Sequence, residues 1–188
     1  MAIDPALGSR ERMLEATIAL MRGSGLTGAG INEIVRESGA PKGSVYHFFP
    51  AGKLQIATEA LAIYSARVMA FIDAALSAKR APGDKVKALF DAFARRVEEG
   101  EFRKSCAVGT VTLDLDGELE ELRAVLAAAF GEWASLIARH FDLGDPRRTK
   151  SFAGLVLTAI EGAYVRCRAE RTSRPFREAG AWLAELVD

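Results

Sequence analysis

The sequence predicts an all-α protein of about nine helices, with a small N-terminal helix-turn-helix unit followed by a larger helical domain. Along most of the 188 residues, apolar side chains recur at intervals of three and four rather than two. Glycine and proline divide these stretches into helix-sized segments, and a single short segment alternates as a strand would. We expect the domain boundary between residues 1–52 and 53–188.

The first 52 residues predict three short helices joined by tight turns. The first runs from Ser9, its expected N-cap, to Gly25, and the second covers residues 31–38. The third runs from Pro41 to Phe49, because the missing N–H of proline costs nothing at a first helical position. Their inward-facing apolar residues are expected to be Leu14, Ile18, Met21, Ile31, Ile34, Val35, Val45, Phe48 and Phe49. Two short helices around a glycine-containing turn are typical of a helix-turn-helix.

The larger domain begins with one long predicted helix, whose apolar stripe continues without proline from Leu54 to Ala75. Further helices are expected over residues 84–99, 118–141, 146–171 and 175–187. Residues 108–115 are the exception, because Val111, Leu113 and Leu115 alternate with polar residues and local propensity favours a strand. A lone strand would have no partner elsewhere in the chain, so we expect no sheet.

Composition and charge exclude several classes of protein. Hydrophobic residues make up 49% and charged residues 27% of the chain, which is typical of a packed globular protein. The 25 basic residues balance the 25 acidic ones, so any polyanion has to be held by a local patch. The N-terminus lacks a secretion signal and no long uninterrupted apolar run occurs, so we expect a cytoplasmic protein without a membrane span.

Cysteine and histidine are too sparse for a metal cluster, and no cofactor or metal is expected. The chain has two cysteines, Cys106 and Cys167, and two histidines, His47 and His140. A nucleophile and base formed by Cys106 and His140 is the basis of one rival hypothesis, a small helical enzyme. A buried, inert thiol explains Cys106 more simply.

Polar side chains in the helix-turn-helix lie where a phosphate backbone would dock. Lys42 and Lys53 fall in the first turns of successive helices, where a cation opposes the helix dipole unless an anion is bound. Helix N-termini also offer unpaired N–H groups to phosphates. Glu37 is the one acidic residue between Arg36 and Lys53.

The residues between the two lysines suit contact with nucleic acid. Gly43 would let the helix approach a surface closely, while Ser44, Tyr46 and His47 carry donors that contact phosphates and base edges. Each residue alone favours an ordinary solvated helix face. Their joint placement on a helix-turn-helix favours a DNA-binding surface.

With the helix before it, this stretch resembles the DNA-binding domain of TetR-family transcriptional repressors. Residues 39–44 (GAPKGS), 46–50 (YHFFP) and 52–54 (GKL) are similar to the branch of LmrA- and YxaF-type regulators, over about residues 9–64. The resemblance implies that the helix over residues 41–48 enters the major groove and that Ser44 lies nearest the bases. The full expected DNA-binding set is Gly30, Arg36, Lys42, Gly43, Ser44, Tyr46, His47 and Lys53.

One position departs from the family pattern. Many members have Thr or Ser as the N-cap of the second helix, where this chain has Gly30, so a backbone N–H is expected to replace the hydroxyl. Beyond residue 64, residues 104–108 and 160–163 resemble parts of the LmrA-type C-terminal domain, in which the stretch after Cys106 is helical. We therefore expect a helix there in spite of the strand propensity.

The larger domain is expected to bind a small effector. Most of its aromatic residues are expected to be core, but some could line a pocket between helices. The expected lining is Phe93, Leu113, Phe130, Trp133 and Tyr164. No cluster of charge is apparent there, so we expect an apolar or aromatic effector.

The last two predicted helices are the expected dimer interface. Gly154, Thr158 and Gly162 recur every four residues and leave a shallow strip for a neighbouring helix. The apolar residues expected at the interface are Phe152, Val156, Ile160, Trp182, Leu183 and Leu186. The alternative is that the strip packs only inside the monomer. The resemblance implies a four-helix dimer bundle, and a palindromic site requires a twofold protein.

The primary hypothesis is a homodimeric repressor that binds a palindromic double-stranded DNA operator and is released by its effector. Effector binding would change the separation of the two recognition helices through the long helix that begins near Leu54. The alternatives are the enzyme described above and a helical ligand carrier whose N-terminal unit contacts protein.

Overall fold

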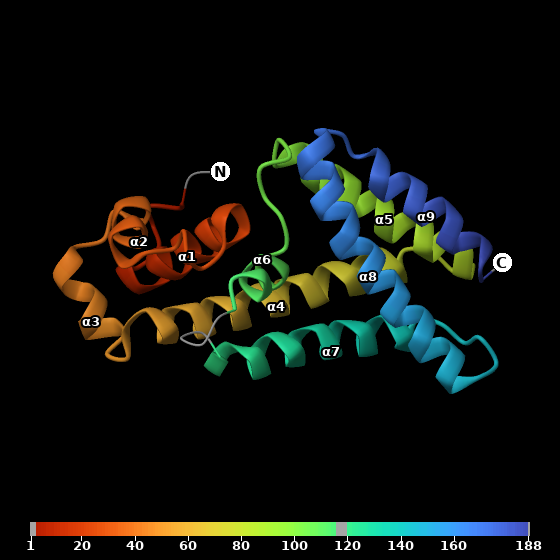
Figure 1. Cartoon of the computed structure of the whole chain (residues 1–188), viewed down its shortest axis with the longest axis horizontal. Coiled ribbons are helices and arrows are strands. Elements are labelled where there is room, and N and C mark those ends of the chain that lie inside the picture. The colour runs from red at the N-terminus through yellow and green to blue at the C-terminus, as the bar shows by residue number, and fades with distance from the viewer. Residues whose placement is uncertain (1–2, 116–119, 188) are drawn as a thin grey trace. The chain divides into compact units, whose positions relative to one another are not determined.

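The computed structural model describes residues 3–115 and 120–187 and confirms the all-α class. These residues form nine α-helices and two short 3₁₀ helices, without a β-strand (Figure 1). Contacts divide the chain into two compact units. Unit 1 contains residues 1–65 and 106–128, and unit 2 contains residues 66–105 and 129–188. This division into units differs from the domain boundary expected at residue 52. That boundary stays a prediction.

Unit 1 begins with α1 (Ser9–Ser24) and α2 (Ile31–Ser38), which pack against each other. The N-cap of α1 is Gly8, so the expectation that Ser9 is the cap is wrong by one position. Gly25 ends α1 with a φ of 67°, in the left-handed region that glycine favours. α2 has the predicted bounds and ends at Gly39, with a φ of 60°.

The helix expected over residues 41–49 is shorter and more irregular than predicted. A 3₁₀ turn, η1 (Lys42–Ser44), precedes α3 (Val45–Phe48), and Pro41 is an extended N-cap with a ψ of 133° rather than a first helical residue. Gly43 and Ser44 have low helix propensity, which favours the tighter turn. Val45 and Phe49 are fully buried, as expected, whereas Phe48 is half-buried.

A helix, α6 (Ala107–Leu113), occupies the segment whose local propensity favoured a strand. Val108 and Val111, three residues apart, are buried on one side of it. The hydroxyl of Thr110 donates to the carbonyl of Met21 at 2.6 Å, and α6 thereby packs on α1. The helix implied by the family resemblance is confirmed.

Unit 2 is built from the second part of α4 (Gly52–Ser77), α5 (Pro82–Glu99), most of α7 (Arg123–Arg139), α8 (Pro146–Glu170) and α9 (Arg174–Glu185). α5 and α9 lie side by side (Figure 1). The predicted bounds are close to these. The start expected for α7 at residue 118 lies outside the described residues, and a 3₁₀ turn, η2 (Glu120–Leu122), precedes the helix.

Among the described helices, α4 has the length and apolar composition of a membrane span, with a mean hydropathy of 1.4 in its most apolar window. Several of its large apolar residues are instead buried in the protein core, including Ile56, Leu61 and Ile72. Alanines account for much of the hydropathy at its exposed positions, which also include the charged Asp73. A core helix of this kind satisfies the same length and composition test as a membrane span.

Candidate nucleic-acid interface

The expected DNA-contacting residues fall on the outer side of one short stretch, residues 41–49, which we call the reading segment. Val45 and Phe49, four residues apart, are buried and anchor it to the core of unit 1. Lys42, Tyr46 and His47 are exposed between these anchors, with Tyr46 at 63%. The alternation of buried anchors and exposed polar groups gives the reading segment an outward polar face.

The beginning of α4 adjoins this face through Tyr46. A Cβ at Gly52 would lie 3.9 Å from the Tyr46 ring, so the ring passes directly over the turn into α4. Gly52 has a φ of 69°, and its N–H donates to the Phe49 carbonyl at 2.8 Å. Lys53, the next residue, is half-buried in the first turn of α4. The positive end of the α4 dipole therefore carries an added cation beside the reading segment.

Gly43 and Ser44 lie in the 3₁₀ turn that opens the reading segment. Gly43 is exposed, and a Cβ there would meet nothing within 4 Å, which fits close approach to a surface. The Ser44 hydroxyl donates to the Pro41 carbonyl at 2.6 Å. Its oxygen keeps its capacity as an acceptor, so a base or backbone donor could still bind it.

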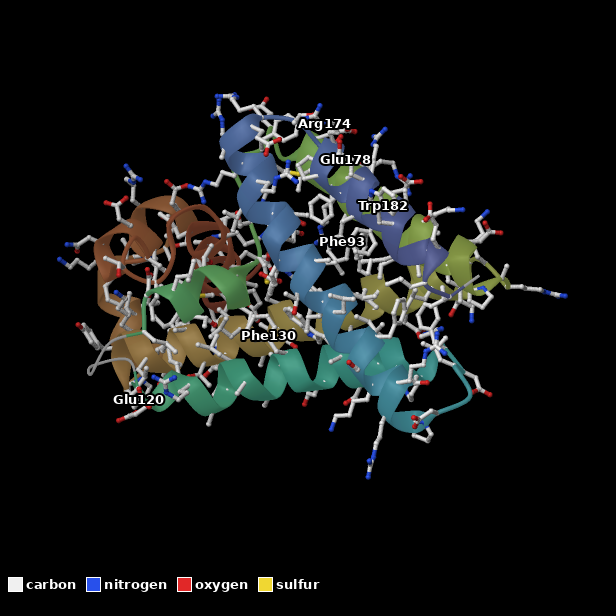
Figure 2. The ribbon with its side chains drawn as sticks, turned by 45° about the vertical axis from the view of Figure 1, so that its right-hand side comes forward. Phe93, Glu120, Phe130, Arg174, Glu178 and Trp182 are labelled. Carbon is white, nitrogen blue, oxygen red and sulfur yellow. The ribbon has the colours of Figure 1, made fainter. Side chains whose placement is uncertain are left out.

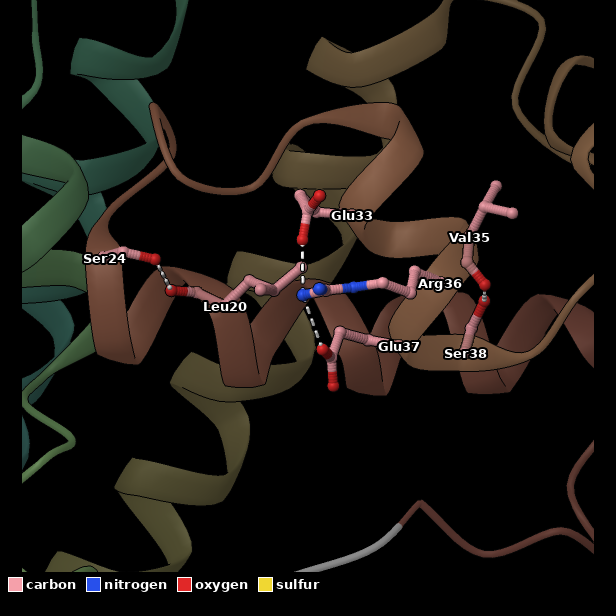
Figure 3. Close-up of polar contacts among 7 residues, drawn as sticks. All are labelled: Leu20, Ser24, Glu33, Val35, Arg36, Glu37 and Ser38. Carbon is pink, nitrogen blue, oxygen red and sulfur yellow. Dashed lines mark hydrogen bonds and ion pairs between the residues drawn. The ribbon is translucent and has the colours of Figure 1, made fainter.

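Arg36 forms ion pairs with two carboxylates of α2 (Figure 3). Its Nη2 lies 2.5 Å from Glu33 and 3.0 Å from Glu37. Its side chain is 67% exposed, and exposed ion pairs of this kind are worth little, so exchange for a phosphate costs little. Glu33 lies before Arg36, outside the stretch from Arg36 to Lys53 in which Glu37 is the one acidic residue.

Gly30 is the N-cap of α2, as expected, with φ −67° and ψ 154° and without a side-chain cap. These angles are open to any residue, and a Cβ there would meet nothing within 4 Å. The first turn of α2 therefore has no hydroxyl at its cap.

Sequence reasoning missed two arginines of α1, which contact the end of α2 and the first part of α4. Arg12 donates to the Ser38 carbonyl, 26 residues away, and Arg10 pairs with Glu59, 49 residues away. No local pattern marks such partners. From the sequence alone, a basic residue on a helix is expected to be a solvated side chain.

The residues expected to line an effector pocket are largely packed against each other in unit 2. Phe93 and Tyr164 are buried, with ring centroids 5.8 Å apart, and both contact the ring of Phe176. Phe130 and Trp133 form a second pair at 5.6 Å, and Trp133 is buried (Figure 2 labels Phe93 and Phe130). In this structure these four side chains serve as packing.

Leu113 does not belong with those residues, and its assignment to an enclosed pocket is corrected. Its side chain is 82% exposed at the end of α6. It lies two residues after the buried Val111, and a shift of two places a helical residue on the other side of the helix. In a strand, Val111 and Leu113 would instead lie on the same face, as the alternating pattern in the sequence suggested.

A shallow depression of about 380 Å³ lies in unit 2 between the end of α7 and the start of α8. Its lining is Ala138, Arg139, Phe141, Asp142, Gly144, Pro146, Thr149 and Lys150. It is not among the sites that the sequence predicted.

The residues expected at a dimer interface divide into two sets. Phe152, Val156, Ile160 and Leu183 are buried within the single chain, so their side chains are part of its core, and their place at a dimer interface stays a prediction. Trp182 on α9 and Leu186, the residue after α9, are exposed, as are two apolar residues of α8 that the prediction omitted, Leu155 and Val165. Figure 2 shows Arg174, Glu178 and Trp182 following one another along α9.

The strip of small residues on α8 is open in the single chain. A Cβ at Gly154 or Gly162 would meet nothing within 4 Å, and Thr158 is exposed. Leu155, Thr158, Gly162 and Val165 are spaced by three or four residues, so they share one face of α8. This face combines small and large side chains, and no element among the described residues covers it.

Cys106 and His140 are each engaged within their own unit. The Cys106 sulfur accepts from the N–H of Gly109 at 3.4 Å, and the thiol is buried. His140 Nε2 lies 2.8 Å from Asp73, and its carbonyl accepts from Lys85. Across residues 3–115 and 120–187, no three His, Cys, Asp or Glu side chains gather as metal ligands would.

Comparison with known proteins gives two matching family models and several relatives. The model described as "Bacterial regulatory proteins, tetR family" matches residues 13–60, and "Transcriptional regulator LmrA/YxaF-like, C-terminal domain" matches residues 82–181. An uncharacterized HTH-type transcriptional regulator of Mycobacterium tuberculosis is 31% identical, over 89% of this chain and 88% of that protein. The HTH-type transcriptional regulator LmrA of Bacillus subtilis is 29% identical, over 95% and 96%.

Solved structures show the same fold. The regulatory protein TetR from Rhodobacter sphaeroides has a TM-score of 0.84 at 18% identity, covering 94% of this chain and 97% of that chain. A cysteine mutant of the TetR-family regulator CifR, complexed with 26-bp double-strand operator DNA, has a TM-score of 0.83 at 18% identity. That alignment covers 99% of this chain and all of the other.

Proposed function

Because the chain belongs to the TetR family of bacterial transcriptional regulators, in the branch with an LmrA/YxaF-like C-terminal domain, we propose that it is an effector-controlled repressor. It binds a palindromic operator as a homodimer in the cytoplasm, and a small apolar or aromatic effector releases it. Membership of the family identifies a transcriptional regulator with a DNA-binding fold. We propose in addition that it represses, that it is a homodimer and that an effector releases it.

The polar outer face of the reading segment is the observation that carries DNA binding. Lys42, Tyr46 and His47 are exposed over the buried anchors Val45 and Phe49. The sequence contains no acidic residue from position 38 to position 58. Cations and neutral donors therefore meet a phosphate backbone without a repelling carboxylate within this stretch.

The exposed face of α8, with Trp182 of α9 and the following Leu186, supports the homodimer. Exposed apolar side chains that share a helix face mark sites of protein association. A symmetric pair of reading segments can contact two major grooves about 34 Å apart, as a palindrome requires. The CifR structure with operator DNA shows that this fold is compatible with DNA binding in another member.

Effector control is supported by the aromatic composition of unit 2. A ligand that separates the Phe93, Tyr164 and Phe176 rings would be apolar or aromatic, since these rings offer it apolar faces. A coupling of about 1–3 kcal/mol between effector and DNA would change operator affinity by some 5–150-fold. Mass spectrometry of small molecules that co-purify with the protein tests this part.

Lys53 provides the test of DNA binding. The wild-type protein is first used to select an operator from a randomised double-stranded library, and affinity is measured by fluorescence anisotropy at several salt concentrations. Lys53→Ala is expected to weaken binding and lower the salt slope by about 0.9, the value of one phosphate contact. Lys79→Ala, which removes an exposed lysine from unit 2, is the control and should leave both unchanged. Failure to enrich any sequence would contradict the proposed function.

A further inference from the structure

The reading segment is too short to hold its own orientation. Its helical part is limited to the three-residue η1 and the four-residue α3. Isolated helices shorter than about 12 residues are marginal in water, because a single turn gains few hydrogen bonds for the entropy it loses. Its alignment with a groove therefore depends on groups outside it.

Arg12 of α1 holds the chain just before the reading segment. Its Nε donates to the carbonyl of Ser38 at 2.9 Å, at the end of α2. Its two other nitrogens donate to the Leu7 carbonyl at 2.7 Å and the Ser9 hydroxyl at 3.3 Å. Because three acceptors hold the guanidinium in place, its hydrogen bond to the Ser38 carbonyl also holds Ser38 in place. The Ser38 hydroxyl accepts from the N–H of Ala40, next to Pro41.

Arg10 holds the other end of the reading segment. Its guanidinium lies over the ring of Phe49, the last residue of the segment, at 5.2 Å from the ring centroid. It also pairs with Glu59 of α4. The other oxygen of Glu59 accepts from Gln55 at 3.0 Å, and Gln55 accepts from the N–H of Ala51 at 3.0 Å. A continuous polar chain thus links α1 to the turn that follows the reading segment.

We propose that Arg10 and Arg12 are positioning residues for DNA recognition, which together fix the two ends of the reading segment. The inference rests on the proposed DNA-binding function. Non-specific binding depends on charge, whereas sequence-specific binding needs base contacts in correct geometry. Loss of either anchor therefore lowers affinity for the operator far more than affinity for random DNA.

Glu59→Gln gives a test in which charge and positioning predict opposite signs. The substitution removes a negative charge, so electrostatics alone would tighten binding to every duplex. Loss of the partner of Arg10 instead weakens operator binding by about fivefold or more, a typical effect for a broken contact network. Both affinities are measured by anisotropy, with the selected operator and a random-sequence duplex of equal length.

Matched variants separate positioning from folding and from charge. Glu120→Gln removes an exposed carboxylate from an ion pair of the same unit and should leave the operator-to-random ratio unchanged. Gln55→Ala breaks the polar chain without a change of charge, and decides the question if Glu59→Gln does not fold. Arg10→Gln is compared with Arg123→Gln, which loses the same charge from the Glu120 ion pair.

The inference is supported if the ratio falls in Glu59→Gln, Gln55→Ala and Arg10→Gln while the salt slope stays at its wild-type value. It is overturned if the ratio equals that of the wild type in folded Glu59→Gln and Gln55→Ala. A salt slope lowered by about 0.9 in Arg10→Gln also overturns it, because Arg10 would then contact a phosphate directly. A wild-type protein that prefers no DNA sequence overturns the proposed function itself.

Discussion

Two glycines of unit 1 show how one residue type meets two different requirements. Gly25 ends α1 with a φ of 67°, and a Cβ there would collide with the carboxylate of Asp114. That carboxylate accepts from the N–H of Thr27 at 2.9 Å. Gly43 is exposed and has open space around it. The structure requires a glycine at position 25, while at position 43 it leaves room for a side chain, and only the proposed DNA contact would require a glycine.

Alanine at the two positions is therefore expected to have opposite effects. Gly25→Ala should lower the free energy of unfolding by about 1–3 kcal/mol, because the backbone is strained and Asp114 must move. Gly43→Ala should change it by less than about 0.5 kcal/mol but weaken operator binding, because the added methyl group meets the DNA. Urea denaturation measures the free energy of unfolding, and fluorescence anisotropy measures operator affinity. A stable Gly25→Ala, or full operator binding by Gly43→Ala, would contradict these assignments.

Cys167 is expected to be an unreactive thiol. It is almost completely buried, and burial raises the pKa of its thiol, with a further contribution from the nearby Glu170 carboxylate. The thiolate is the nucleophile, so at pH 8 the folded protein should react slowly with iodoacetamide and rapidly in guanidinium. Cys106→Ser leaves Cys167 as the single thiol for this measurement.

The same shift predicts a loss of stability at high pH. A raised pKa in the folded state favours the protonated thiol there, so its contribution is complete below the ordinary pKa of 9.0 and is lost as pH rises through the folded value. Cys167→Ala should remove this part of the pH dependence above pH 9. In the iodoacetamide experiment, equal alkylation rates in folded and denatured protein would show that the Cys167 thiol is not buried.

At the scale of elements, the packing of α5 on α9 depends on a glycine. A Cβ at Gly180 would lie 2.6 Å from the Cβ of Phe90, closer than such atoms approach. Phe90 is fully buried and its ring lies 6.3 Å from that of Phe176, so it has little freedom to move. The close approach of the two helices therefore requires the absence of a side chain at position 180.

Gly180→Ala is expected to destabilise unit 2 by about 1–3 kcal/mol through overpacking. Gly131→Ala is the matched control, since Gly131 is exposed in the interior of α7 and a Cβ there would meet nothing. That substitution should stabilise the protein by about 0.5–1 kcal/mol through helix propensity. Thermal unfolding followed by circular dichroism compares the two, and a lower melting temperature for Gly131→Ala than for Gly180→Ala would refute the packing argument.

α6 shows how tertiary contacts override local preference. Its β-branched residues favour a strand on their own, but Val108 and Val111 are buried on one helical face and Thr110 bonds to α1. The reading segment shows a second limit of prediction from sequence. Its turn residues and anchors were visible in the sequence, but the 3₁₀ start at Lys42–Ser44 was not, because helix geometry over so few residues depends on its surroundings.

At the scale of the whole molecule, the exposed face of α8 and α9 predicts a dimer that charge can disrupt. Val165→Glu places a carboxylate on that face, so the variant is expected to elute as a monomer in size-exclusion chromatography with light scattering. Leu113→Glu is the control, since Leu113 is an exposed apolar residue of unit 1, at 82% against 63% for Val165, and this variant should stay dimeric. A Val165→Glu protein of twice the chain mass would place the interface elsewhere.

The sequence by itself determined the all-α class, the helix-turn-helix and the outward polar face of its reading segment. These depend on apolar periodicity and on turn residues such as Gly39 and Gly52, which act within a few positions along the chain. Only the tertiary structure decided which apolar residues of α8 and α9 face solvent, where Leu113 points, and that Arg10 and Arg12 hold the reading segment. Those features depend on contacts between residues tens of positions apart, which no local pattern records.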